Sequence, residues 1–216
     1  MMQINCNIST RGENKIRYIV IHDTGNKSKG ADTKAHFNYF NSEYRGSSAD
    51  CFVDDNGPLW VNDYTKFYTW HCGDGQGKFG ITNKNSIGIE LCINEGSDRL
   101  KAMEFLICEV VKTAERLNIP FENIVRHYDA SRKVCPGSMS ANDWEEWKLF
   151  KIEVKRRMSK AEFKDIKGHY AEKHINKLLG YGIVNGDGKG KFHPDDTLTR
   201  ADAAIMIANA LTIMGK

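Results

Sequence analysis

The sequence predicts an α/β fold with a mixed central β-sheet flanked by helices, followed by a small all-α module. Two observations predict this organisation. Short β-branched runs alternate with helix-periodic segments through the first 158 of the 216 residues. From Ser159 onward the chain instead contains two helical stretches joined by a glycine-rich loop, whereas all six cysteines and all four tryptophans lie before residue 150. We therefore expect two domains, residues 1–158 and 159–216.

The predicted strands are short and apolar. Ile16–Ile21 is nearly continuously apolar and ends at the turn signal His22–Gly25, which is typical of a buried strand. Ser86–Ile93 alternates, with four aliphatic side chains on one face and Glu90 on the other. Two shorter strands are expected at 51–53, before a hairpin turn, and at 123–127.

The helices are predicted from apolar residues that recur every three or four positions. The clearest is Arg99–Leu117, capped by Ser97 or Asp98. In the second domain, Thr199 stands at an N-cap position and Asp202 at the capping-box position. Further helices are expected at 31–40, from about 142 to 158, and at 169–179 and 199–214.

Composition excludes several classes of protein. Apolar residues make up 40% and charged residues 27%, which is too apolar for a disordered chain. The net charge of +3 is far from that of a dedicated nucleic-acid binder, and no apolar run is long enough to span a membrane. Residues 1–15 lack the apolar core of a signal peptide, so we expect synthesis in the cytoplasm, with cysteines as free thiols or metal ligands.

Three residues have the chemistry of a zinc site. His22 follows a central strand, His127 ends a short strand, and Cys135 lies eight residues further on, before Pro136 and Gly137. Two histidines and one cysteine are a ligand set for tetrahedral Zn²⁺ with an open fourth position, as in a catalytic site. The alternative is that these histidines only form hydrogen bonds to loops.

Glu90 and Lys133 are candidate catalytic residues. A carboxylate in the middle of a strand must be desolvated or paired, and a desolvated carboxyl has a raised pKa that suits general base or acid work. The alternative is a salt bridge from Glu90 to Arg126. Lys133, two residues before Cys135, would stabilise an oxyanion, unless it is a solvated loop lysine.

Four motifs resemble the type 2 N-acetylmuramoyl-L-alanine amidases, a family that includes bacteriophage endolysins and is related to peptidoglycan recognition proteins. They are IVIHDTG (19–25), WHCGDGQG (70–77), NSIGIELCIN (85–94) and VRHYDASRKVCPG (125–137), and the resemblance covers residues 14–158. It implies a mixed sheet with flanking helices. It also implies a zinc ion held by His22, His127 and Cys135, with Glu90 and Lys133 at catalytic positions.

The resemblance also bears on substrate binding. His71, in the Trp70–His71 pair, matches a cleft-lining position, so both residues are candidates for substrate contact; the alternative for His71 is a packed core histidine. Many relatives carry a tyrosine or histidine on the strand before the acidic turn, where this chain has Ala49, Asp50 and Cys51. A tyrosine role is therefore not transferable, which strengthens Glu90 as the base, with Asp50 a weaker substitute.

The expected reaction is hydrolysis of the amide that joins N-acetylmuramic acid to L-alanine, by zinc-activated water. Glu90 would take the proton and return it to the leaving amine, while Lys133 and Zn²⁺ would hold the oxyanion. We expect an endolysin that reaches the cell wall after release at lysis. The alternatives are a non-catalytic peptidoglycan-binding protein, a regulator and an autolysin of the bacterium itself.

Residues 163–211 resemble one S-layer homology repeat, with TRAD at 199–202 and HYA at 169–171. Such repeats bind anionic secondary cell-wall polymers and usually occur in threes. The resemblance therefore implies wall binding, with Arg200 as the candidate for an acidic sugar or else a helix-capping residue, and a possible homo-oligomer. The loop at 185–196 loosely resembles a calcium loop, but Lys189 occupies a ligand position and Asp196 replaces the usual glutamate, so calcium is not expected.

Overall fold

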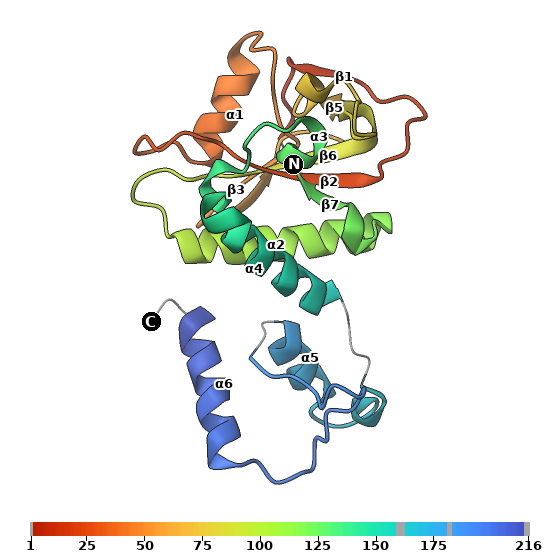
Figure 1. Ribbon diagram of the computed structural model, residues 1–216, viewed down its shortest axis with the longest axis vertical. Coiled ribbons are helices and arrows are strands. Elements are labelled where there is room, and N and C mark those ends of the chain that lie inside the picture. The colour runs from red at the N-terminus through yellow and green to blue at the C-terminus, as the bar shows by residue number, and fades with distance from the viewer. Residues whose placement is uncertain (1, 159–162, 181–182, 214–216) are drawn as a thin grey trace. The chain divides into compact units, whose positions relative to one another are not determined.

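The computed structural model describes residues 2–158, 163–180 and 183–213 (Figure 1). The chain forms two compact units, Met1–Val154 and Lys155–Lys216. The sequence places the domain boundary after residue 158, whereas the units divide four residues earlier, within a helix. The predicted α/β class is confirmed in the first unit.

The first unit is built on a five-stranded mixed sheet in the order β4-β3-β6-β2-β7. β2 is parallel to both β6 and β7, β3 is parallel to β6, and β4 alone runs antiparallel, as the second strand of a hairpin with β3. The carboxyl ends of the parallel strands therefore meet at one edge, where ligands bind in open α/β sheets. The strands are β2 (Tyr18–Asp23), β3 (Cys51–Asp54), β4 (Gly57–Trp60), β6 (Ser86–Leu91) and β7 (Ile124–Arg126).

Helices cover both faces of this sheet. Figure 1 shows α2 (Arg99–Leu117) and α4 (Ala141–Met158) on one side, and α1 (Thr33–Ser42) and α3 (His127–Ser131) on the other. On the α1 side, Phe52 packs in a buried cluster with Phe37 and Phe40 at its margin. Further along the same face, Val20 packs with Ala130 of α3. The side chains of His22 and Glu90 belong to this face, since they alternate with Ile21 and Ile89.

Most predicted elements are confirmed, with differences at their ends. Arg99–Leu117 is helical as predicted, and Asp98 is its N-cap, accepting a hydrogen bond from the Lys101 amide at 3.0 Å. The strand expected at 123–127 stops at Arg126, so His127 instead opens α3. The sequence did not predict the two-stranded sheet of β1 (Ile8–Thr10) and β5 (Phe67–Thr69), because three-residue strands carry too little pattern.

Asp50 connects β6 to the neighbouring segments through buried hydrogen bonds. It is fully buried, and its carboxylate accepts hydrogen bonds from the Asn62 amide at 2.6 Å, the Thr69 hydroxyl at 2.8 Å and the Gly88 backbone at 2.8 Å. Arg11 lies near enough for its charge to lower the pKa of Asp50, although burial dominates and raises that pKa overall. Both carboxylate oxygens are engaged in structural contacts, so the structure does not favour Asp50 as a substitute for the missing tyrosine.

Replacing Asp50 with alanine should destabilise the first unit by about 3–5 kcal/mol, because three buried donors lose their acceptor and the buried Arg11 loses a nearby negative charge. Urea unfolding followed by tryptophan fluorescence measures this, since all four tryptophans lie in residues 1–154. Asp143→Ala, at a carboxylate whose side chain is 89% exposed, is the control and should stay within about 0.5 kcal/mol. Equal midpoints for the two variants would contradict the role given to Asp50.

The second unit is small and helical. α5 (Glu172–Gly180) packs through Ile175 against Phe163 and Ile166, and α6 (Arg200–Ile213) follows an irregular loop. The predicted cap is confirmed, since the Thr199 hydroxyl accepts a hydrogen bond from the Asp202 amide at 3.1 Å. Among the described residues, no helix is both long and apolar enough to cross a membrane.

The glycine-rich loop of this unit is organised by Asp187. One oxygen of its carboxylate accepts hydrogen bonds from the backbone amides of Lys189 and Lys191, at 2.7 and 3.0 Å, and the other lies 3.1 Å from a ring nitrogen of His193. The carboxylate thus stabilises the loop from within, which is its structural use here.

Candidate metal centre

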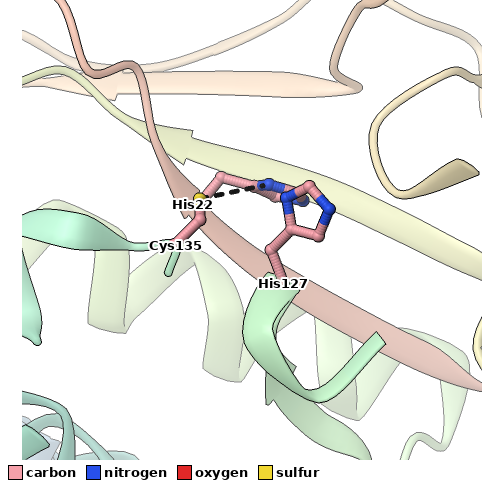
Figure 2. A group of neighbouring side chains, drawn as sticks. All are labelled: His22, His127 and Cys135. Atoms are coloured by element: carbon pink, nitrogen blue, oxygen red, sulfur yellow. Dashed lines mark hydrogen bonds between the residues drawn. The ribbon is translucent and has the colours of Figure 1, made fainter. Parts of the chain in front are cut away.

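The three predicted metal ligands meet at the carboxyl edge of the sheet. His22 lies near the end of β2, His127 opens α3, and Cys135 lies in the loop that follows (Figure 2). One ligand atom from each falls within 4.8 Å of the other two. All three residues are buried, with exposed fractions of 2%, 4% and 6%. A site so enclosed, with two imidazoles and a thiol converging on one point, has the donors that Zn²⁺ prefers.

His22 uses its two ring nitrogens for different partners. Nδ1 faces Cys135 Sγ at 3.7 Å and Glu90 Oε1 at 3.9 Å, while Nε2 lies 3.1 Å from Nδ1 of His71. Burial lowers the pKa of His22 well below its ordinary value, and the nearby rings of His71 and His127 lower it further. The imidazole is therefore neutral at pH 7, as a metal ligand must be.

His127 also has one ring nitrogen in contact with a neighbouring side chain. Its Nε2 lies 2.7 Å from a carboxylate oxygen of Asp74, in the short turn η1 (Gly73–Gly75). Its Nδ1 is buried and has no hydrogen-bond partner among the described residues. A buried nitrogen lone pair without a partner is costly unless something binds it. This nitrogen and the neutral donor set fit a metal ion.

Burial also changes the pKa of the Cys135 thiol. Burial raises its pKa to about 12, and the charge of Glu90 contributes. Without a metal the thiol is therefore protonated at pH 7, whereas a metal ligand must be a thiolate. Metal binding by this site should consequently release a proton.

Glu90 lies beside the three ligands. It pairs in register with His22 across β6 and β2, and its Oε2 is buried without a hydrogen-bond partner among the described residues. Burial raises its pKa well above the ordinary value, and the charge of Asp23 adds to this. The alternative of a Glu90–Arg126 salt bridge is not what the structure shows, because Arg126 pairs with Asp129 at 2.7 Å.

Lys133 is exposed on the loop before Cys135. Its positive charge acts on the same centre, since it lowers the pKa values of His22, His127 and Glu90. Lys133 is therefore an exposed residue whose positive charge acts on the cluster.

The candidate substrate-binding residues are separated by the structure. His71 is 7% exposed and contacts His22, which matches the packed-histidine alternative more closely than a cleft wall. Trp70 is half-buried, with its indole N–H donating to the Ser9 hydroxyl at 3.0 Å and its ring 5.6 Å from that of Tyr44. Arg200 is exposed at the start of α6, in the second unit.

Asp74 is a site residue that the sequence did not predict. The residue lies inside the quoted motif WHCGDGQG, three positions after His71, but carboxylates in glycine-rich loops are common and its partner is 53 residues away. The useful signal was the motif itself, because a histidine and an aspartate in one short segment can reach two metal ligands.

The absence of a side chain at Gly88 leaves the space that the His71 ring occupies. A Cβ at this position would lie 2.6 Å from Cγ of the His71 ring, closer than real side chains approach. Gly88→Ala should therefore displace His71 from His22 and weaken zinc binding by at least about 10-fold, the scale of losses seen for outer-shell changes. Competition with a chromophoric chelator measures the affinity. Gly137→Ala, whose Cβ would meet only Asp23 at an ordinary 3.9 Å, is the control, and equal affinities in both variants would contradict the prediction.

The comparisons with known proteins agree with this geometry. Residues 12–138, more than half of the chain, match the family model described as N-acetylmuramoyl-L-alanine amidase. The chain belongs to this amidase family. Residues 162–204 match the family model described as S-layer homology domain, so the chain carries this second domain after the amidase-family region. Both resemblances seen in the sequence are confirmed.

Two curated relatives are similar over more than half of this chain. The chain is 35% identical over 119 residues to N-acetylmuramoyl-L-alanine amidase CwlH of Bacillus subtilis strain 168, covering 55% of this chain and 46% of the relative. It is 34% identical over 131 residues to XlyA of the same organism, covering 61% and 42%. The chain thus spans less than half the length of these two relatives.

Solved structures share the fold. The catalytic domain of XlyA superposes with a TM-score of 0.58 at 32% identity, covering 65% of this chain and 86% of that one. A mutant endolysin from Bacillus subtilis gives 0.59 at 31% identity, covering 71% and 99%. The chain is also 38% identical over 52 residues to the surface-layer 125 kDa protein of Lysinibacillus sphaericus, a match that covers 24% of this chain and 4% of that protein.

Proposed function

We propose that this amidase is a zinc-dependent peptidoglycan hydrolase that cleaves the amide between N-acetylmuramic acid and L-alanine. The observation that carries the proposal is the convergence of His22, His127 and Cys135 beside Glu90, whose Oε2 is buried and has no hydrogen-bond partner among the described residues. Family membership supports the same substrate class. His22, His127 and Cys135 would hold the zinc ion, which would supply Lewis-acid chemistry for an attacking water and the scissile carbonyl.

Proton transfer, stabilisation of the oxyanion and substrate contact are assigned to separate residues of the protein. Glu90 is the general base, because its raised pKa makes it a better proton acceptor than an ordinary carboxylate, and it returns the proton to the leaving amine. Lys133 supplies positive charge on the solvent side, where the oxyanion of the reaction develops. Trp70, with Tyr44 at its edge, offers a half-buried aromatic surface for substrate contact.

The S-layer homology domain is proposed to hold the enzyme on the wall through an anionic secondary polymer. Arg200 is exposed at the first residue of α6, where a guanidinium can pair with an acidic sugar. A charge-removing variant, Arg200→Gln, should lower the fraction of protein that sediments with Gram-positive walls and leave hydrolysis of soluble muropeptide unchanged. Unchanged sedimentation would count against Arg200. Light scattering on the intact chain tests self-association of the single repeat.

Wall digestion distinguishes this function from its alternatives. Purified Gram-positive walls are incubated with the protein, and new L-alanine amino termini are counted against new reducing sugar ends, with and without chelator. We expect new amino termini that the chelator abolishes, and no new reducing ends. Reducing ends without amino termini would rule out amidase activity, and binding to walls with neither product would favour the non-catalytic alternative.

A further inference from the structure

A chain of hydrogen bonds runs from a backbone carbonyl to His22. The Ser86 hydroxyl donates to the carbonyl oxygen of Thr82 at 2.5 Å and lies 3.1 Å from Nε2 of His71. Nδ1 of His71 in turn lies 3.1 Å from Nε2 of His22. Ser86 is fully buried and His71 nearly so, so water does not compete for these contacts.

The direction of every bond in this chain follows from its first member. A carbonyl oxygen only accepts, and a hydroxyl has a single proton, so Ser86 gives that proton to Thr82 and must accept from His71. His71 therefore carries its proton on Nε2 and has a lone pair on Nδ1, which accepts from Nε2–H of His22. The remaining nitrogen of His22, Nδ1, is left with its lone pair toward Cys135.

Asp74 imposes the same choice on His127. A carboxylate only accepts, so the 2.7 Å contact places the proton of His127 on Nε2 and leaves Nδ1 with a lone pair. A Cβ on Gly75 would overlap the carbonyl oxygen of Ala130, so glycine is what lets this turn lie against α3. The Asn83 side chain holds the segment by accepting from the backbone amides of His71 and Cys72, at 3.0 and 2.8 Å.

We propose that Ser86, His71 and Asp74 are positioning residues that fix the tautomers of both histidine ligands, so that each presents Nδ1 to the metal. The proposal rests on the metal site of the proposed function. It assigns a role to the segment WHCGDGQG, which supports both ligands from one stretch of chain: its His71 orients His22, and its Asp74 orients His127. Outer-shell partners of this kind set ligand orientation and metal affinity.

The tautomers can be observed directly in the metal-free protein. Long-range ¹H–¹⁵N NMR spectra of the full chain should show His22, His71 and His127 protonated on Nε2. In Ser86→Ala, nothing fixes which atom donates in the hydrogen bond between His71 and His22. Both histidines should therefore become mixtures of tautomers. In Asp74→Asn the amide N–H can donate to His127, which should move its proton to Nδ1.

Zinc affinity is the second readout. Ser86→Ala and Asp74→Asn should each weaken zinc binding by about 10- to 100-fold, measured by chelator competition. Ser9→Ala is the matched control for the serine, because Ser9 contacts the neighbouring Trp70 rather than His71, and Asp143→Asn is the control for the aspartate. Both controls should bind zinc within about 2-fold of the original chain, inside the scatter expected of changes remote from the site.

The outcomes separate this proposal from the proposed function. An Nδ1-protonated His22 or His127 in the original metal-free chain would overturn it, as would unchanged zinc affinity in both variants. A loss of affinity that tracks only a lowered melting temperature, with tautomers unchanged, would also overturn it and indicate a merely structural role. Neither readout uses enzymatic activity, so a failed wall digestion leaves the test intact.

Discussion

Replacing Cys135 with serine should lower wall-digesting activity by at least about 100-fold, because the site loses its only thiolate and the open position for water depends on all three ligands. A serine hydroxyl does not ionise at neutral pH, so it supplies no negative charge to the metal. The same variant should bind zinc more weakly in chelator competition. It should also lose the proton release on metal binding expected from a thiol whose pKa is raised to about 12.

The matched control is Cys6→Ser. Cys6 is a free, half-buried thiol that donates to the Asn41 carbonyl at 3.3 Å, outside the cluster, and a serine hydroxyl can make the same bond. Its activity and zinc affinity should be those of the original chain. Full activity in Cys135→Ser, or activity that survives exhaustive chelation, would remove zinc from the mechanism.

Replacing Glu90 with glutamine should reduce kcat by about 10²–10⁴-fold, the range for loss of a general base or acid. Glutamine has nearly the same shape but cannot accept the proton. Because Glu90 is not among the three ligand residues and its Oε1 lies 3.9 Å from His22, zinc affinity should change by less than about 10-fold. Separate measurements of kcat and of zinc binding therefore distinguish a catalytic loss from a damaged metal site.

Glu95→Gln is the control for this change, since Glu95 is exposed on the loop that follows β6. It should retain full activity. If Glu90→Gln kept more than about a tenth of the original kcat, the proton acceptor would have to be another group. If Glu90→Gln instead lost zinc and activity together, Glu90 would be a residue that supports the metal site.

The sequence predicts an element most accurately where the periodic pattern of apolar residues extends over several turns. The 19 residues of α2 carry several turns of apolar spacing and a capping aspartate, and their bounds are as predicted. His127 was placed at the end of a strand, because the β-branched residues before it favour extended structure. In the folded protein the Arg126 backbone amide donates to Asp129 at 2.9 Å, which caps the helix that His127 opens. Such caps involve single side chains and leave almost no periodic signal.

The sequence by itself indicated the residue types of the candidate metal site, although His127 opens a helix instead of ending a strand as expected. His22, His127 and Cys135 are recognisable because zinc needs nitrogen and sulfur donors, and strand ends and tight turns bring such donors together. Only the tertiary structure decided which ring nitrogen each histidine presents. It also decided that His71 contacts His22, that Asp74 contacts His127, and that Arg126 pairs with Asp129 and not with Glu90. The physical reason is that the direction of a hydrogen bond depends on its acceptor, and the Thr82 carbonyl and the Asp74 carboxylate lie about 50 residues or more from the ligands they control.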